Sequence, residues 1–395
     1  MADILMINVP AEGHVNPSLG VAKAFADRGD NVHYITTEKY KSRLEGVGAH
    51  VYLHEDHLLI GGVDPSSEEG IQSFINIMLQ TSLDILSITK QLAEEISFDF
   101  VYYDSFGAGE LVRDYLQIPG FSSSASFLIP EDYRKRLPLH PDHTDTLEYS
   151  DRNKQLMETM NQEFGVAPSS MLQFMHNQGE QTMVYTSAYF QPRLEEFGEE
   201  NYFIGPSFPE RKGAHDFPLQ ELKNEKVLYI SMGTVLDQVE EFFNLCIDAF
   251  GDFKGKVVIA AGSFTDFNKI NTAPENFIIR SYVPQLEVLE YTDVFLTHGG
   301  MNSVNEAIDN EVPMVVLPRD KDQPMVAARL AELHAGYPIF PNEVSKEALH
   351  RGVDQVVNDE AYLEGIRKIK KSFDHCGGPQ EALAVIDRYL NKRNG

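Results

Sequence analysis

The chain has 395 residues, 42% hydrophobic and 24% charged, which suits about two globular domains with sizeable cores. Its formal net charge of −27 argues against nucleic acid as a partner, because an acidic surface repels phosphate backbones. No apolar run reaches the roughly 18 residues of a membrane span, and no basic leader precedes the first apolar run. The two cysteines lie far apart in the sequence. We therefore expect a cytoplasmic protein with reduced thiols.

The first half of the chain alternates short apolar strands with helical patterns. The predicted strands cover residues 4–9, 32–36, 51–54, 100–104 and 183–186. A helix is predicted over 16–28, with Asn16 as its cap, Pro17 in its first turn and Gly29 after its end. This βαβ alternation predicts a parallel sheet covered by helices.

The second half repeats the alternation. Its predicted strands cover 227–231, 257–261, 277–282, 294–297 and 314–317. Between the two sets, residues 205–217 mix proline and glycine with charge, which is typical of a linker. We therefore expect two α/β domains, over residues 1–208 and 209–378. Ligands should lie beyond the carboxyl ends of the strands, in a cleft between the domains.

A glycine pair follows the predicted strand 294–297. A helix is predicted from Asn302, so His298–Met301 form a tight turn in which Gly299 and Gly300 allow positive φ and close approach of a ligand. Unpaired N–H groups at the helix start, with nearby side chains, would make a cradle for a diphosphate. Taken alone, the pair is equally well explained as an ordinary strand-to-helix turn.

Three further residues, Tyr282, Val283 and Glu306, suggest a binding site for a nucleoside. Glu306 lies one helical turn beyond Asn302 and can accept both hydroxyls of a ribose. The ring of Tyr282 can stack on a base whose edge meets the backbone of Val283. Singly, Glu306 is more often part of a solvated helix face and Tyr282 more often a core aromatic; the combination favours a ligand.

The combined pattern resembles the signature of the UDP-glycosyltransferases of the GT-B fold, especially the bacterial macrolide- and flavonoid-type enzymes of bacilli. The resemblance covers essentially the whole chain and rests on the motifs Gly13-His14-x-x-Pro17, Tyr282-x-Pro284-Gln285, His298-Gly299-Gly300-x-Asn302-Ser303, Glu306, Val312-Pro313 and Asp322-Gln323. It implies an α/β GT-B architecture with two Rossmann-like parallel-sheet domains facing across a cleft. The domain over 1–208 would bind the acceptor, the domain over 209–378 would bind the nucleotide sugar, and a last helix in 379–395 would cross back to the first domain. Tyr282 replaces the tryptophan of the plant pattern, and Glu311 replaces a glycine.

The resemblance also implies donor-binding roles. Tyr282 and Val283 would hold uracil, Gln285 and Glu306 the ribose, and Asp322 and Gln323 the sugar hydroxyls. The diphosphate would be bound by His298, Gly300, Asn302 and Ser303. A second phosphate-side turn matches Ser231-x-Gly233-Thr234.

His14 and Asp104 are the predicted catalytic residues. Each follows or ends a predicted strand, so both belong to one edge of the sheet. A histidine can accept the proton of an attacking hydroxyl, and a carboxylate can orient it. The resemblance implies an inverting reaction with His14 as general base. Without it, His14 is slightly better explained as a helix-entry residue and Asp104 equally well as a helix cap.

We expect no metal and no other cofactor. Asp320 and Asp322 flank Lys321 with a spacing that divalent metal sites use, but the helix N-terminus already stabilises the leaving group. We also expect a monomer.

The acceptor pocket is expected in the first domain. Residues 121–130, with Phe121 and Phe127, and the apolar helical stretches 71–96 and 157–176 would suit flavonoids, other polyphenols or macrolides, although any one of these residues is more often part of a core. The expected function is UDP-sugar-dependent O-glycosyl transfer, with UDP-glucose as donor. The alternatives are a non-catalytic nucleotide-sugar sensor, against which the His14–Asp104 pair argues, and a lipid or cell-envelope glycosyltransferase, against which the acidic composition argues. A dehydrogenase is disfavoured because no Gly-x-Gly-x-x-Gly follows the first strand.

Overall fold

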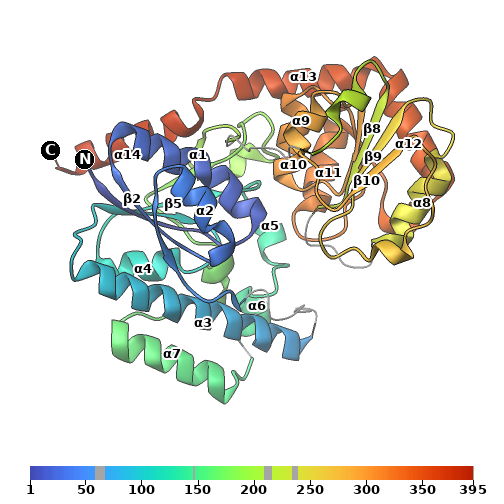
Figure 1. Ribbon diagram of the computed structural model, residues 1–395. Coiled ribbons are helices and arrows are strands. Elements are labelled where there is room, and N and C mark those ends of the chain that lie inside the picture. The colour runs from blue at the N-terminus through green and yellow to red at the C-terminus, as the bar shows by residue number, and fades with distance from the viewer. Residues whose placement is uncertain (58–66, 146, 209–215, 234–238, 395) are drawn as a thin grey trace. The chain divides into compact units, whose positions relative to one another are not determined.

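The computed structural model describes residues 1–57, 67–145, 147–208, 216–233 and 239–394. The chain forms two compact units (Figure 1): unit 1 contains residues 1–186, 193–209 and 376–395, and unit 2 contains 187–192 and 210–375. Residues 209–215 of the predicted linker lie outside the described residues.

The expected first domain therefore differs from unit 1 in one internal segment, residues 187–192. Arg329 holds this segment in unit 2 by donating to the carbonyls of Phe190 and Tyr189 at 3.0 and 2.7 Å. Ser187 also hydrogen-bonds Ser372 at 2.6 Å.

Unit 1 is built on a seven-stranded parallel sheet with the order β3-β2-β1-β4-β5-β6-β7. Its strands are β1 (Asp3–Ile7), β2 (Asn31–Thr36), β3 (His50–Leu53), β4 (Phe100–Asp104), β5 (Gly120–Ser124), β6 (Gln181–Val184) and β7 (Asn201–Phe203). Its helices are α1 (Glu12–Arg28), α2 (Glu38–Gly46), α3 (Glu68–Ala93), α4 (Gly109–Leu116), α5 (Glu131–Arg134), α6 (Pro141–Thr144), α7 (Asp151–Phe164) and α14 (Gly378–Asn394), with 3-10 turns η2 (Met171–Met175) and η3 (Leu194–Glu196).

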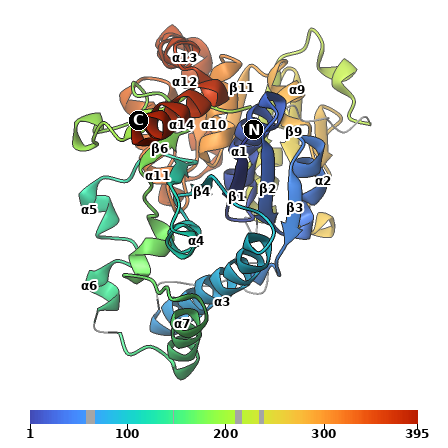
Figure 2. The ribbon, with the colours of Figure 1, turned by 90° about the vertical axis from the view of Figure 1, so that its left-hand side faces the viewer.

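Helices cover both faces of this sheet because successive strand residues point to opposite sides. Ile4 and Met6 pack in one core with α1, α2 and α14, and Leu5 and Ile7 pack in a second core with α3, α4 and α7. Helix α7 runs alongside α3 on that second side (Figure 2).

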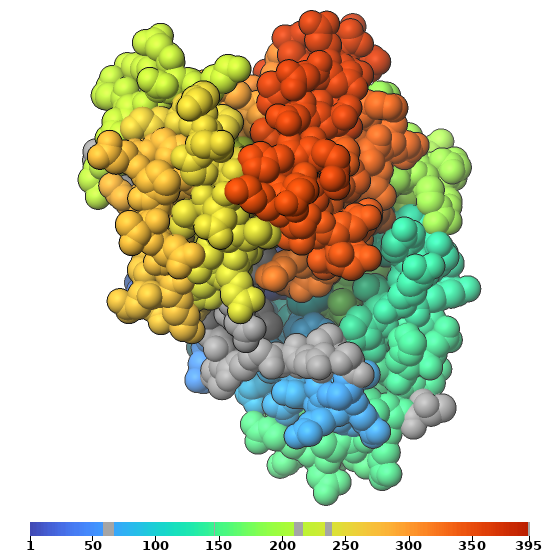
Figure 3. All heavy atoms as spheres, turned by 90° about the vertical axis from the view of Figure 1, so that its right-hand side faces the viewer, coloured from blue at the N-terminus to red at the C-terminus, as the bar shows by residue number. Residues whose placement is uncertain are grey.

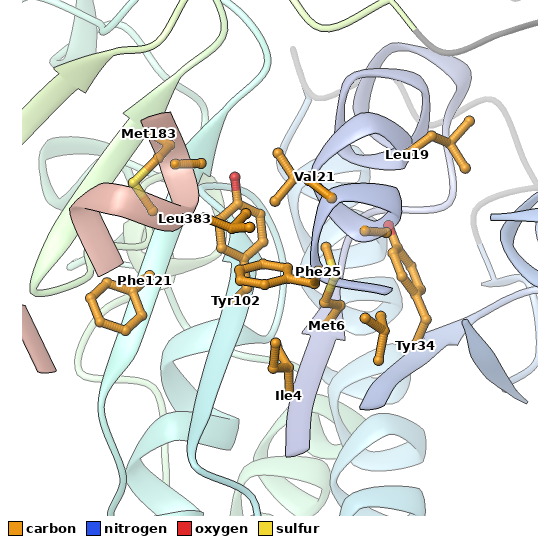
Figure 4. Close-up of a cluster of buried hydrophobic side chains, with 14 of the residues drawn as sticks. Ile4, Met6, Leu19, Val21, Phe25, Tyr34, Tyr102, Phe121, Met183 and Leu383 are labelled. Carbon is orange, nitrogen blue, oxygen red and sulfur yellow. The ribbon is translucent and has the colours of Figure 1, made fainter. Parts of the chain in front are cut away.

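The last helix, α14, belongs to the first of these cores (Figure 4). Leu383 lies there among Phe25, Tyr102 and Met183, and the Tyr389 ring meets that of Phe121 edge-on at 5.4 Å. The chain thus returns to unit 1 after completing unit 2.

Unit 2 contains a six-stranded parallel sheet with the order β10-β9-β8-β11-β12-β13. Its strands are β8 (Val227–Ser231), β9 (Lys256–Ala260), β10 (Phe277–Arg280), β11 (Val294–Thr297), β12 (Met314–Val316) and β13 (Gly336–Pro338). Its helices are α8 (Glu240–Phe250), α9 (Gln285–Leu289), α10 (Met301–Asp309), α11 (Gln323–Glu332), α12 (Lys346–Asn358) and α13 (Glu360–Asp374), with 3-10 turns η4 (Leu219–Leu222), η5 (Phe267–Lys269) and η6 (Pro341–Glu343). Helix α12 packs beside α8 (Figure 3, orange-red and yellow).

The expected α/β class with two parallel-sheet domains is confirmed. In each sheet the direction of winding reverses between two adjacent strands, β1 and β4 in unit 1 and β8 and β11 in unit 2. Such a switch point is where ligands of doubly wound sheets bind. No helix in the described part of the chain is long and apolar enough to cross a membrane. That the protein is a cytoplasmic monomer stays a prediction.

Candidate functional site

Unit 1 places a histidine–carboxylate pair at its switch point. The Nδ1 atom of His14 lies 2.7 Å from Oδ2 of Asp104, the last residue of β4. The Asp104 side chain is 1% exposed, whereas that of His14 is 33% exposed. The other carboxylate oxygen accepts the Phe106 N–H at 2.7 Å. A buried aspartate therefore holds one ring nitrogen of a histidine that remains open to solvent.

His14 lies inside helix α1, which corrects the predicted helix start. The Ala11 carbonyl accepts from the N–H groups of His14 and Val15 at 3.0 and 2.9 Å, so the helix begins four residues before Asn16. Asn16 is buried and accepts from Arg43 at 2.9 Å instead of capping the helix. Pro17 is buried in the interior of the helix and not in its first turn as predicted, and it has no N–H to donate to the Gly13 carbonyl.

Unit 2 places the predicted glycine turn between β11 and α10. Gly299 has a φ of +85°, and a Cβ there would lie 2.7 Å from Val316 Cγ1. Gly300 is the N-cap of α10, and Asn302 and Ser303 lie in its first turn. The predicted strand–turn–helix unit is confirmed, and it brings the positive end of α10 to the switch point.

Two glycines enclose the His298 ring. A Cβ on Gly300 would lie 2.6 Å from His298 Nε2, and a Cβ on Gly233 would lie 2.9 Å from His298 Cε1. Burial lowers the pKa of His298 below its usual value, against the opposing effects of Asp322 and of the Ser231 backbone. The ring is therefore neutral near pH 7, and its Nδ1 is buried with no hydrogen-bond partner within the described residues.

The two predicted ribose-binding residues contact each other. Gln285 donates its Nε2 to Oε2 of Glu306 at 2.6 Å and to the Ser303 hydroxyl at 3.1 Å, and it accepts from Tyr229 at 3.1 Å. Glu306 is 1% exposed, so it does not lie on a solvated helix face. The carboxylate is held by hydrogen bonds beside the start of α10.

Tyr282 lies in the loop after β10 and is 58% exposed, while the neighbouring Val283 is 5% exposed. The structure therefore excludes the core-aromatic interpretation of Tyr282. A flat exposed ring on a fixed backbone is available for stacking.

The remaining predicted donor residues border the same edge of the sheet. Ser231 ends β8 opposite Thr297 of β11. Gln323 is buried and accepts from the Arg319 N–H at 2.9 Å, and Asp322 precedes it at the N-cap of α11. Thr234 falls outside the described residues.

The acceptor prediction needs one correction. Phe121 is 0% exposed on β5 and packs between Phe100 and Tyr389, so it is a core residue and not part of a pocket. Phe127 is 2% exposed. Sequence patterns missed Asn8, Thr81 and Phe106, which line a cavity beside the His14–Asp104 pair. The one signal available was that Asn8 is a polar residue near the carboxyl end of the predicted strand 4–9.

Comparison with known proteins identifies the family. Residues 213–384 match the family model described as UDP-glucoronosyl and UDP-glucosyl transferase. The chain is 58% identical over 394 residues to UDP-glucosyltransferase YdhE of Bacillus subtilis strain 168, which is described as uncharacterized, with 100% of both chains covered. The chain belongs to the UDP-glycosyltransferase family.

Two further relatives extend this result. NDP-glycosyltransferase YjiC of Bacillus subtilis strain 168 is 30% identical over 400 residues, covering 98% of this chain and 97% of the relative. The crystal structure of the glycotransferase of kitacinnamycin superposes with a TM-score of 0.84 at 26% identity, covering 98% of each chain. The protein is a glycosyltransferase with the GT-B fold.

Proposed function

We propose that this glycosyltransferase transfers glucose from UDP-glucose to a hydroxyl of a small hydrophobic acceptor, with inversion at the anomeric carbon. The observation that carries the proposal is the 2.7 Å contact between His14 and the buried Asp104. A purely nucleotide-sugar-binding protein has no use for a buried aspartate that fixes the tautomer of an exposed histidine.

The chemistry follows from this geometry. Asp104 accepts a hydrogen bond from the Nδ1–H of His14. In this tautomer Nε2 carries no proton and can accept one. The acceptor oxygen forms a bond to the anomeric carbon while the bond from that carbon to the diphosphate oxygen breaks. The acceptor proton goes to His14, and Asp104 stabilises the imidazolium; UDP leaves with the bonding electron pair.

The donor side is proposed in unit 2. Tyr282 stacks on uracil and the Val283 backbone meets its edge, Gln285 and Glu306 hold the ribose, and the α10 N-terminus binds the diphosphate. In this proposal the diphosphate is bound by His298, Gly300, Asn302 and Ser303, and the turn after β8 makes a second phosphate contact. Asp322 and Gln323 bind the sugar. The relatives named for UDP-glucose and for NDP-sugars support this class of donor.

We propose that the reaction needs no metal, because the α10 dipole and the N–H groups at its N-terminus stabilise the leaving diphosphate. The acceptor side is proposed in unit 1, where the Phe106 ring lies 6.0 Å from the His14 ring and lines a cavity together with apolar residues of α3. Flavonoids, other polyphenols and macrolides have the required flat or extended apolar surface.

The test is a turnover assay with UDP-glucose and a panel of phenolic and macrolide acceptors. We expect His14→Ala to lower kcat/KM by about 10²–10⁴, the contribution of a general base. UDP-glucose binding, measured by calorimetry, should stay unchanged, because the proposed donor residues belong to unit 2. His50→Ala, a change of an exposed histidine in the same unit, is the matched control.

Product formation should also survive EDTA treatment and desalting. If activity were lost and then restored by Mg²⁺ or Mn²⁺, the metal-free mechanism would be wrong. Undiminished turnover in His14→Ala would remove His14 as the base. UDP-glucose binding with no product from any acceptor, lipids included, would favour the sensor alternative.

A further inference from the structure

A small cavity lies beside the His14–Asp104 pair, within unit 1. It is formed by residues 7–10 after β1, by one side of α3 and by residues 106–108 after β4. Its volume is about 20 Å³, which is room for about one small polar group such as a water molecule or a hydroxyl. Most of its walls are apolar, including Ile7, Met78 and Ile85.

Asn8 supplies one polar wall, and its orientation is fixed. Its Nδ2 lies 3.3 Å from the His14 carbonyl and 3.5 Å from Asp104 Oδ2, both of which are acceptors. A flipped amide would set its oxygen against these two acceptors, so the amide orientation follows from its partners. Asn8 is 2% exposed, and its Oδ1 is buried without a partner in the described structure.

Thr81 of α3 supplies the second polar wall. Its Oγ1 is buried and also lacks a partner among the described residues. The adjacent Ser82 lines the same cavity, but its hydroxyl donates to the Met78 carbonyl at 2.7 Å, so it is already satisfied. The cavity therefore presents one obligate acceptor, Asn8 Oδ1, and one hydroxyl that can donate.

The acceptor Asn8 Oδ1 and the Thr81 hydroxyl together determine which chemical group can occupy the cavity. A hydroxyl can donate to Asn8 and accept from Thr81, whereas an ether or a carbonyl has no proton for Asn8 and a cation finds no charge here. Unsatisfied buried polar atoms disfavour an apolar group in the same space. One hydroxyl group fits both the space and the two oxygens.

The cavity is also linked to the reacting site. Asn8 joins it to Asp104, and Phe106 lines the cavity while its ring lies 6.0 Å from the His14 ring. A ligand group in this cavity would thus lie on the same side of the sheet edge as the proposed base.

We propose that this cavity is a subsite for a second, non-reacting hydroxyl of the acceptor, bound between Asn8 and Thr81. The subsite rests on the proposed function, and it narrows the substrate class to acceptors with at least two hydroxyls, one at His14 and one in the cavity. Asn8 is then both a positioning residue for Asp104 and a specificity residue for the acceptor.

The experiment compares naphthalenediols, with the second hydroxyl at different positions, with the corresponding naphthols. At least one diol should exceed its naphthol in kcat/KM about 5- to 10-fold, the effect of one satisfied buried hydrogen bond. Thr81→Val, which keeps the shape and removes the hydroxyl, should abolish that preference while kcat/KM for the naphthol stays within about two-fold. Thr81→Ser should restore the preference.

Ser82→Ala is the matched control, because it removes a satisfied hydroxyl from the same cavity wall. Calorimetric binding of each diol and naphthol to the wild type and to Asn8→Ala gives a second readout without turnover. A diol preference in binding that Asn8→Ala removes would support the subsite even if the wild type transferred no glucose, in which case only the proposed function would fail.

Three results would overturn the subsite. The first is equal kcat/KM and equal binding for every diol and its naphthol, and the second is no binding of either. The third is a lower thermal stability of Thr81→Val with an unchanged diol preference, which would show that the cavity holds a structural water only.

Discussion

Two residues of unit 2 have a burial that is unusual for their type. Tyr282 is 58% exposed, whereas Glu306 is 1% exposed. Folding alone disfavours both, because a large aromatic gains by burial and a carboxylate loses its hydration unless it is hydrogen-bonded. Gln285 supplies that hydrogen bond to Glu306. An exposed ring in the loop after β10 and a buried acid on α10 are better explained by a ligand than by stability.

We predict that Tyr282→Ala raises the Kd for UDP-glucose about 5- to 100-fold, because stacking of a base on an aromatic ring contributes roughly 1–3 kcal/mol. Stability should change by less than about 0.5 kcal/mol, since the ring packs in no core. Calorimetry and thermal unfolding measure the two effects. Phe267→Ala, at another exposed aromatic of unit 2 (45%), is the control. An unchanged Kd in Tyr282→Ala would exclude the stacking role.

His176 makes the stability of unit 1 depend on pH. Burial, and then the adjacent Arg134, lowers its pKa from 6.5 to about 4. Its Nε2 lies 2.9 Å from Arg134 Nη1 and 3.1 Å from Gln178 Nε2, both donors, so a proton there would break two hydrogen bonds.

Between pH 6.5 and about 4 the unfolded chain binds a proton that the folded chain does not, so stability is complete above pH 6.5 and falls as the pH is lowered. This loss amounts to roughly 3 kcal/mol by pH 4. We predict that His176→Gln, which keeps an acceptor, loses less stability between pH 7.5 and 4.5 than the wild type in denaturant unfolding. The exposed His375→Gln should follow the wild type; equal losses in all three proteins would contradict the prediction.

At the scale of elements, the sequence predicted most of both sheets because apolar strands separated by helices are a strong pattern. It missed β5, whose residues read Gly-Phe-Ser-Ser-Ser, because serine is a poor strand signal. The structure satisfies those hydroxyls locally: Ser122 bonds Thr182 at 2.7 Å, and Ser123 donates to the Tyr103 carbonyl at 3.3 Å. The segment can therefore form a buried strand because its hydroxyls find hydrogen-bond partners elsewhere in the fold, and the local sequence does not reveal these partners.

The site was predicted best where spacing along one element determines it. The turn from Thr297 to Asn302 depends on local backbone geometry, so the motif was sufficient. Asn8 and Thr81 are 73 residues apart in sequence (81 − 8) and meet only because α3 packs on the β1 end of the sheet. Residues that come together from such distant parts of the sequence leave no periodic pattern from which their contact could be predicted.

Helix α14 is an integral part of unit 1. Leu383 is 4% exposed and packs among Phe25, Tyr102 and Met183 in the core that α14 shares with α1 (Figure 4). We predict that Leu383→Ala lowers the free energy of unfolding by about 2–5 kcal/mol, from lost burial and the cavity left behind.

Denaturant unfolding measures this change, and UDP-glucose affinity should stay unaltered in native conditions. Arg388→Ala on the exposed side of the same helix should cost about 1 kcal/mol, because it removes an exposed ion pair with Glu381 and a cation–π contact with the Tyr202 ring. If the two variants lost equal stability, α14 would not be packed as the structure shows.

At the scale of the whole molecule, the formal net charge of −27 opposes the approach of the anionic donor that we propose. The long-range field would repel the proposed donor, UDP-glucose. In this proposal its binding therefore depends on short-range groups at the α10 N-terminus and on Arg319 and Lys321 in the loop before α11. Salt screens the distant carboxylates much more than contacts within a few ångströms.

We therefore predict that raising NaCl from about 10 to about 150 mM increases kcat/KM for UDP-glucose a few-fold, because the Debye length falls from about 30 to about 8 Å. The KM of a neutral phenolic acceptor should not change over the same range. Steady-state kinetics at fixed pH check both, with choline chloride in place of NaCl to exclude a specific effect of sodium. A fall in kcat/KM for the donor would mean that local cations outweigh the acidic surface even at long range, and that the approach of the donor is steered by them.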